Sequence, residues 1–259
     1  MGNNDDKTPE IRFDVGAITA PILRASRDSV EVIALALKSI ASADLSIRPD
    51  IEAASGEPIV GFDNGPRDPV ERRQAYTNWL LAKGFQDLAR GIHDTLKEAF
   101  LYVELFPRNG TSFPVSIFET ARRTAATLSF PGLLKEIERR LSMTLHFSDQ
   151  LNSIQQVRNC LEHRSGIVGD IDLDNTDYLR LTLPRWQLIG IAEGKEFDLV
   201  PGYVTVAETR VALKRENRER IYKRRESISI LPEEFGEIAH SCWLLAQDIV
   251  AHLPRAQTS

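Results

Sequence analysis

The chain has 259 residues, of which 42% are hydrophobic, 27% charged and 7% aromatic. This length allows one large domain or two modest ones, and the composition excludes a collagen-like or largely disordered protein. The 37 acidic and 32 basic side chains give a formal net charge of −5, so nucleic-acid binding would require a local positive patch.

The cysteine content and the first residues indicate a reducing compartment. Cys160 and Cys242 are the two cysteines and form no Cys-x-x-Cys pair, so we expect both to be reduced and buried. The start MGNNDDKTPE is polar and acidic, unlike a secretory signal or a transit peptide. No apolar run approaches the roughly 18 residues that a membrane span needs. We therefore expect a cytoplasmic protein with no membrane contact.

Apolar residues recur at helical spacing along most of the chain. After a flexible lead-in at 1–25, the pattern predicts a helix that Ser26 caps and a long helix that Asp68 and Pro69 open. Gly84 and Gly91 inside the long helix suggest a close approach of another helix, or a slight bend. The predicted helices cover residues 27–42, 69–106, 115–128, 131–146, 148–164 and the segment from Pro232 onward.

A period of two replaces the helical period between residues 171 and 231. Short strands are expected at Tyr178–Leu183, Arg185–Ile191, Tyr203–Val206 and Arg210–Leu213, with a further one within 218–230. Turn signals stand at Pro184, Glu193-Gly194, Pro201-Gly202 and Glu216-Asn217.

These patterns predict an α+β protein that is mainly α. A helical bundle would be built by residues 26–170 and completed by the last helix at 232–259, with a small antiparallel β insertion at 171–231. We expect the helix at 148–164 to pack beside both the long helix and the last helix.

The helix at 148–164 carries the most informative residues. Leu151, Ile154, Val157 and Leu161 form its apolar stripe. Asn159 and His163 each lie about 200° from a residue of that stripe, so they point away from the core and stack on one face. Arg158 lies about 140° from His163 on an ideal helix, so it reaches the histidine only through its long side chain, a bend, or a second copy of the helix.

The segment QVRNCLEHRSGIV, residues 156–168, resembles the active-site segment of the HEPN superfamily, the "higher eukaryotes and prokaryotes nucleotide-binding" helical domains. The family pattern is an Arg, often followed by a polar residue such as Asn, and a His after four to six intervening residues. Arg158, Asn159 and His163 match it, and Ser165-Gly166 matches the small residues that commonly follow. The resemblance covers this segment and its helical setting, and not the rest of the chain.

The resemblance implies metal-independent endoribonuclease activity without a cofactor, in which the ribose 2′-hydroxyl attacks the adjacent phosphate and leaves a 2′,3′-cyclic phosphate. His163 would transfer protons near neutral pH, Arg158 would stabilise charge on the phosphoryl oxygens, and Asn159 would orient the phosphate or the imidazole. It further implies a homodimer in which two motifs face each other, and a toxin or defence role with an antitoxin or regulatory partner.

Two alternatives stay open at the level of sequence. Arg158 can instead form an i,i+4 ion pair with Glu162 while His163 is a solvated residue near a helix C-terminus. The protein would then be a non-catalytic HEPN-like dimeric module that binds nucleotide, nucleic acid or a protein partner.

A basic stretch lies in the β segment and is the strongest local concentration of positive charge. It could follow an RNA backbone, or it could be the solvated face of a hairpin whose charges discourage edge pairing. The candidate RNA contacts are Lys214, Arg215, Arg218, Arg220, Lys223 and Arg224. The remaining histidines are too scattered to predict a metal site.

Overall fold

The computed structural model describes residues 14–46, 68–109, 111–174, 176–199, 202, 204 and 208–255. Within them the chain forms six α-helices and three strands, which confirms an α+β fold that is mainly α. The helices are α1 (Ala20–Ser42), α2 (Pro69–Leu105), α3 (Val115–Thr127), α4 (Phe130–Leu141), α5 (Ser148–His163) and α6 (Pro232–His252). The strands are β1 (Tyr178–Ala192), β2 (Lys195–Asp198) and β3 (Arg210–Lys223).

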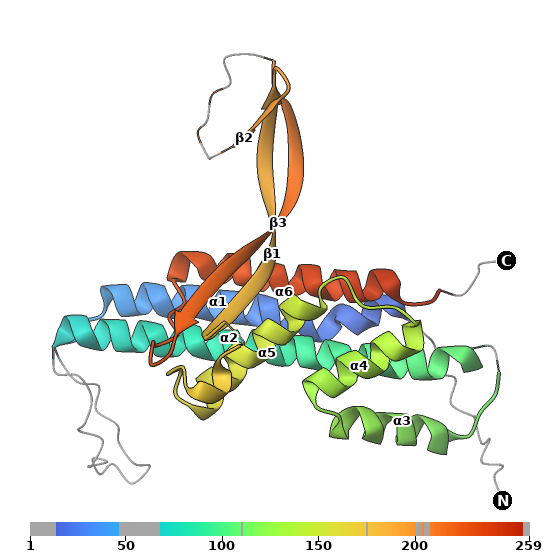
Figure 1. Ribbon diagram of the computed structural model, residues 1–259. Helices are drawn as coiled ribbons and strands as arrows, with labels where there is room; N and C mark the ends of the chain where they lie inside the picture. The colour runs from blue at the N-terminus through green and yellow to red at the C-terminus, as the bar shows by residue number, and fades with distance from the viewer. Residues whose placement is uncertain are drawn as a thin grey trace, which may run out of the picture.

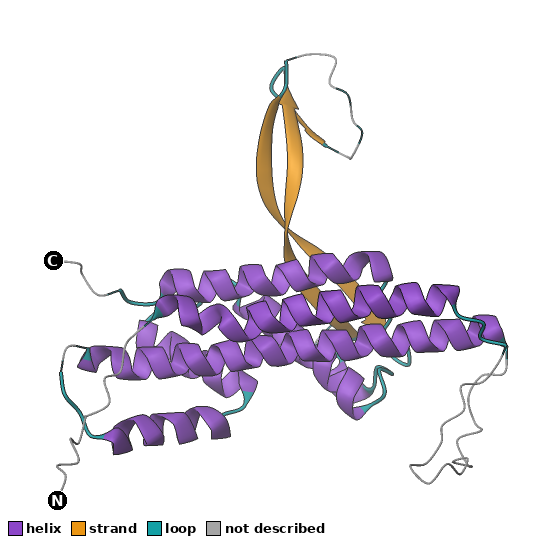
Figure 2. Ribbon diagram, turned by 180° about the vertical axis from the view of Figure 1, so that it is seen from behind, coloured by secondary structure: helices purple, strands orange, loops and turns teal. Residues whose placement is uncertain are grey.

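Three long helices form the main layer of the bundle. Figures 1 and 2 show α1, α2 and α6 side by side, and all three contact one another. Helices α3, α4 and α5 pack against α2 from the opposite side. The apolar faces of α2, α4, α5 and α6 meet in one buried cluster that includes Phe85, Phe100 and Phe130. None of the helices in the described residues combines the length and the apolar character required to cross a membrane.

The first helix begins earlier than its sequence indicates. We expected a lead-in up to residue 25 and a cap at Ser26, but α1 starts at Ala20, after a 3-10 turn at Val15–Thr19. Pro21 lies in the first helical turn, where a proline lacks no hydrogen bond, so it opens the helix rather than interrupting it. The expectation for residues 14–25 was therefore wrong, and residues 1–13 lie outside the described part.

The two glycines of α2 allow other helices to approach its backbone. A Cβ atom at Gly84 would come 2.1 Å from Cδ1 of Ile33, and one at Gly91 would come 2.7 Å from Cβ of Ala25. Both neighbours belong to α1, and the helix continues through both positions. The close approach expected from the sequence is confirmed.

The strands are longer than predicted and form one sheet with the order β2-β1-β3. Strand β1 continues through Pro184 because no backbone N–H is required toward β3 at this position. Thr182, two residues earlier, directs its N–H and C=O away from β3, to the Ser153 hydroxyl of α5, and the backbone of Pro184 has the same orientation. The turn expected at Glu216-Asn217 was wrong, since β3 runs straight through both residues. Glu216 forms an ion pair with Arg185, the residue opposite it on β1, and this pair stabilises the continuous strand.

The turn between β1 and β2 agrees with its prediction. Glu193 and Gly194 both have positive φ, 53° and 75°, which the tight connection of two antiparallel strands requires. The strand expected at 203–206 falls outside the described residues, except for Val204, which belongs to no strand.

Strands β1 and β3 form a twisted ribbon whose base is part of the core and whose far half extends beyond the helices (Figure 1). At the base, Leu179, Leu181, Leu183 and Tyr222 are buried in the main cluster. β1 packs against both α5 and α6, so the sheet takes the place beside α5 that we had expected α6 to occupy. Helix α5 packs against α2 and β1 and, less extensively, against α4.

Candidate functional site

Helix α5 presents the Arg-Asn-x-x-x-His motif on the outside of the bundle. Leu151, Ile154, Val157 and Leu161 are all buried, as their spacing predicted, and they fix which face of the helix points inward. The side chain of His163, on the opposite face, is 60% exposed. The expectation that the histidine is not a core residue is confirmed.

The motif residues meet around one carboxylate, that of Glu162. The Arg158 guanidinium forms an ion pair with Oε2 of Glu162, and Nε2 of His163 lies 3.8 Å from the same oxygen. Nη1 of Arg158 also donates to Oδ1 of Asn159 at 3.1 Å, and that oxygen accepts a second hydrogen bond from Nε2 of Gln155 at 2.9 Å. One polar cluster therefore contains a guanidinium, a group that can bind anions, and an imidazole, a group that can transfer protons.

This arrangement answers how Arg158 reaches His163 in a single chain. Arg158 and His163 are linked through Glu162, which lies between the two residues around the helix, and not by direct contact. The i,i+4 pair that the alternative interpretation requires is thus present. Gln155 is an additional member of the cluster, and its position four residues before Asn159 is the sequence signal for it.

The end of α5 is held in place by a buried ion pair. Arg164, which follows His163 directly, binds the Asp172 carboxylate through both Nε and Nη2, and Asp172 has a side chain only 2% exposed. Ser165 and Gly166 have positive φ, and the Gly166 N–H returns to the carbonyl of Cys160 at 3.1 Å. Burial raises the pKa of the Cys160 thiol to about 11, so this cysteine is no nucleophile at neutral pH.

His93 of α2 is a neighbour of the motif that we did not select from the sequence. Its ring packs on Phe130 with centroids 5.8 Å apart, and its Nε2 atom is enclosed without a hydrogen-bond partner in the described part of the chain. Burial lowers the pKa of His93, and the positive charges of Lys97 and Arg158 lower it further. Because 65 positions separate His93 from Arg158, no local pattern indicates their proximity.

The basic stretch lies on and just after β3, and acidic side chains accompany most of it. Carboxylates pair with four of the six candidate RNA contacts: Lys214 with Glu196, Arg218 with Glu234 and Glu237, Arg220 with Glu234, and Arg224 with Asp170. Arg215 instead places its guanidinium 3.7 Å from the centre of the Phe147 ring. Lys223 is exposed at the end of the strand.

Only the end of the basic stretch approaches the motif. The Arg225 N–H donates to the carbonyl of Val168 at 2.8 Å, and the Ile228 N–H donates to that of Gly166 at 2.8 Å. These bonds join the turn after His163 to the turn after β3, which includes Arg224. Lys214 and Arg215 belong to the part of the ribbon farther from this junction.

Within the described residues, His, Cys, Asp and Glu side chains form no group of three or more that could hold a metal ion. Comparisons of the chain with protein-family models, with curated proteins and with solved structures find no match. The assignment of a function therefore depends on the residues of the α5 cluster themselves.

Proposed function

We propose that the protein is a metal-independent endoribonuclease of the HEPN type. The observation that carries this proposal is the cluster at Glu162, which gathers Arg158 and His163 on an exposed helix face. The His163 side chain is 60% exposed and that of Arg158 is 27% exposed, so a ligand can reach both, although at Arg158 it has to compete with Glu162.

The chemistry follows from the residue types. His163 accepts the proton of the ribose 2′-hydroxyl, or supplies one to the leaving 5′-oxygen, since an imidazole can act as a general base and as a general acid. The 2′-oxygen forms a bond to phosphorus as the bond from phosphorus to the 5′-oxygen breaks, which leaves a 2′,3′-cyclic phosphate. Arg158 binds the phosphoryl oxygens through its planar fork, and Asn159 holds that fork through its side-chain oxygen.

A second candidate function is a non-catalytic module that binds RNA, nucleotide or a protein. The ion pair between Arg158 and Glu162 favours it, because the guanidinium already has a counter-ion that a phosphate must displace. The homodimer and the role as a toxin or defence effector with an antitoxin partner belong to the same proposal and derive from the resemblance. The cytoplasmic location is also part of the proposal, and it derives from the cysteine content and the first residues of the sequence.

The deciding experiment is cleavage of a labelled RNA in the presence of EDTA by variants of the motif. His163→Ala should lower the rate at least about a hundredfold, since a general acid–base group typically contributes that much. Arg158→Lys should also lose RNA cleavage, because one ammonium cannot replace a planar guanidinium that contacts Asn159 and Glu162 together. His146→Ala is the matched control, since His146 is also exposed and lies two residues before α5 begins, at the end of the helix opposite to His163.

The melting temperature of each variant separates the two functions from a folding defect. We expect it to be unchanged for His163→Ala because the removed ring is mostly solvated. RNA binding without cleavage by the unaltered protein would establish the second candidate. Equal cleavage by the unaltered and His163→Ala proteins would remove the catalytic assignment.

A further inference from the structure

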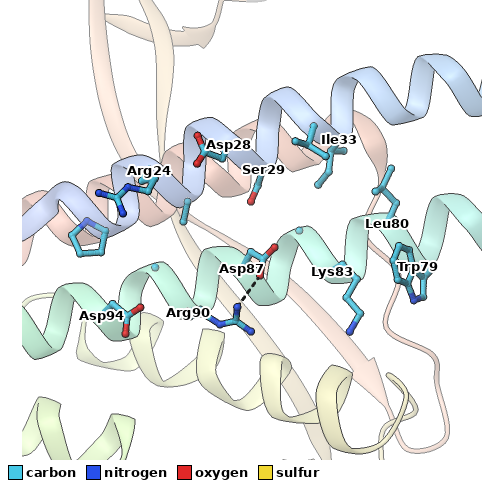
Figure 3. A pocket seen from close by; sticks show the side chains of 15 residues that line it. Arg24, Asp28, Ser29, Ile33, Trp79, Leu80, Lys83, Asp87, Arg90 and Asp94 are labelled. Carbon is cyan, nitrogen blue, oxygen red and sulfur yellow. Dashed lines mark ion pairs between the residues drawn. The ribbon is translucent and has the colours of Figure 1, made fainter. Parts of the chain in front are cut away.

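A groove of about 540 Å³ runs between α1 and α2 (Figure 3). The close approach of the two helices at Gly84 and Gly91 forms its floor. Two large apolar side chains on its walls are open to solvent, Val32 at 61% and Trp79 at 63% exposure. Tryptophan is enriched at surfaces that contact another macromolecule, and Trp79 lies beside this groove.

The α2 side of the groove carries a row of four charges, which we call the α2 charge stripe. Its members are Lys83, Asp87, Arg90 and Asp94, and they alternate in sign. Spacings of four, three and four residues place all four on one face of the helix. Figure 3 shows them along α2, with Lys83 and Arg90 extending toward the side where α5 lies. Asp87 and Arg90 also form an exposed ion pair at 3.6 Å.

The order of these charges makes the stripe complementary to itself. A two-fold axis perpendicular to α2, beside the helix and level with the midpoint between Leu88 and Ala89, places Lys83 of one copy opposite Asp94 of the other, and Asp87 opposite Arg90. Each of the four contacts generated by the axis then joins opposite charges. A parallel arrangement in register would place like charges together instead. A two-fold contact between identical chains requires such a self-complementary surface.

We propose that the α2 charge stripe, with the groove beside it, is the surface through which two copies of this chain associate in antiparallel register. The balance of two bases and two acids in the stripe suits a second copy better than RNA, whose phosphates the aspartates would repel. The second copy also covers Val32 and Trp79.

This contact would place the two α5 motifs on one side of the dimer, since α5 packs against α2. The use of the two motifs to cleave RNA rests on the proposed function, whereas the contact itself is tested without RNA.

The test is charge exchange between two single variants, with the mass in solution measured by sedimentation at low salt. Asp87→Lys places two like-charge contacts across the axis, and so does Arg90→Asp. Each alone should weaken dimerisation at least about tenfold. In an equimolar mixture, the introduced lysine of the first variant faces the introduced aspartate of the second. The unchanged Arg90 of the first then faces the unchanged Asp87 of the second, so the mixture should recover the dimer.

Glu119→Lys on α3 is the control, because Glu119 is exposed and lies on a different helix. Recovery on mixing cannot come from misfolded protein, so it identifies the two-fold register. Single variants as dimeric as the unaltered chain, or a mixture that stays monomeric, would overturn the inference. A strictly monomeric unaltered protein would overturn it too. A dimer of this register without RNA cleavage would refute the proposed function and leave the interface standing.

Discussion

At the scale of single residues, Glu162 is the side chain that most affects what the motif can bind. Its carboxylate forms an ion pair with the guanidinium of Arg158, and a phosphate that approaches Arg158 must compete with this carboxylate. The same carboxylate lies within 3.8 Å of the His163 ring. Glu162 therefore opposes anion binding while it brings Arg158 and His163 to one place on the helix.

We expect Glu162→Gln to strengthen RNA binding about two- to fivefold, which corresponds to loss of a competing exposed ion pair worth ~0.4–1 kcal/mol. The measurement is fluorescence anisotropy with a labelled RNA, made in a His163→Ala background so that no cleavage occurs. Glu119→Gln, far from α5, provides the control for the change in net charge. Binding that is unchanged or weaker would show that Glu162 does not compete with the ligand.

His93 makes the stability of the molecule depend on pH. Burial lowers its pKa below the value of 6.5 for a free imidazole, so the unfolded chain takes up a proton more readily than the folded chain. Stability should consequently fall as the pH decreases through the region below about 6.5. The nearby charges of Lys97 and Arg158 act in the same direction, and that of Asp94 opposes them.

Urea unfolding between pH 8 and pH 5.5 measures this effect. The free energy of unfolding of the unaltered protein should decrease toward pH 5.5 relative to that of His93→Gln, whose amide does not titrate in this range. A parallel pH dependence of the two proteins would show that His93 binds protons equally in the folded and unfolded states.

At the scale of elements, the turn after α5 determines where the motif ends. The ion pair of Arg164 with the buried Asp172 fixes this turn directly after His163. Asp172→Asn should destabilise the protein by about 3–5 kcal/mol, because it leaves a partly buried guanidinium without its counter-ion. For a chain of this size that is a decrease in melting temperature of roughly 6–20 °C.

The same turn supplies the control. Asp170 also forms an ion pair, with Arg224, but its side chain is 77% exposed. Asp170→Asn should therefore change stability by no more than about 1 kcal/mol. Similar melting temperatures for both variants would indicate that burial of Asp172 does not determine the strength of its pair.

At the scale of the whole molecule, the ribbon divides into a base that the bundle needs and an arm that it does not. Of the described residues between Pro184 and Ile221, none belongs to the main core. Gln187 and Lys214 are directly opposite each other and direct their backbone groups toward one another, so a two-residue Asn-Gly turn can close the ribbon after them. Replacing residues 188–213 by that turn should shift the melting temperature of the helices by less than about 3 °C.

Circular dichroism at 222 nm follows this change. A deeper cut that replaces residues 186–215 is the comparison, since it also removes Arg215 from the ring of Phe147 and should lower the melting temperature. A large loss of stability with the shorter deletion would show that the arm contributes to the core.

The sequence by itself determined which segments are helical, the outward direction of His163 and the two positions in α2, Gly84 and Gly91, that another helix can approach closely. The first two depend on residues a few positions away, through helical periodicity, and the third on the absence of a side chain at glycine. It also placed Arg158, Asn159 and His163 on one helix, because their spacing is local.

Only the tertiary structure decided the features that join distant parts of the chain. Turn-forming residues at Pro184 and Glu216-Asn217 became part of continuous strands, in which Ser153 of α5 binds the backbone of Thr182 and Arg185 pairs with Glu216. His93 became a neighbour of Arg158, and the basic stretch acquired acidic partners from β2, α6 and the turn after α5. These contacts bring together residues far apart in the sequence, and no local spacing encodes them.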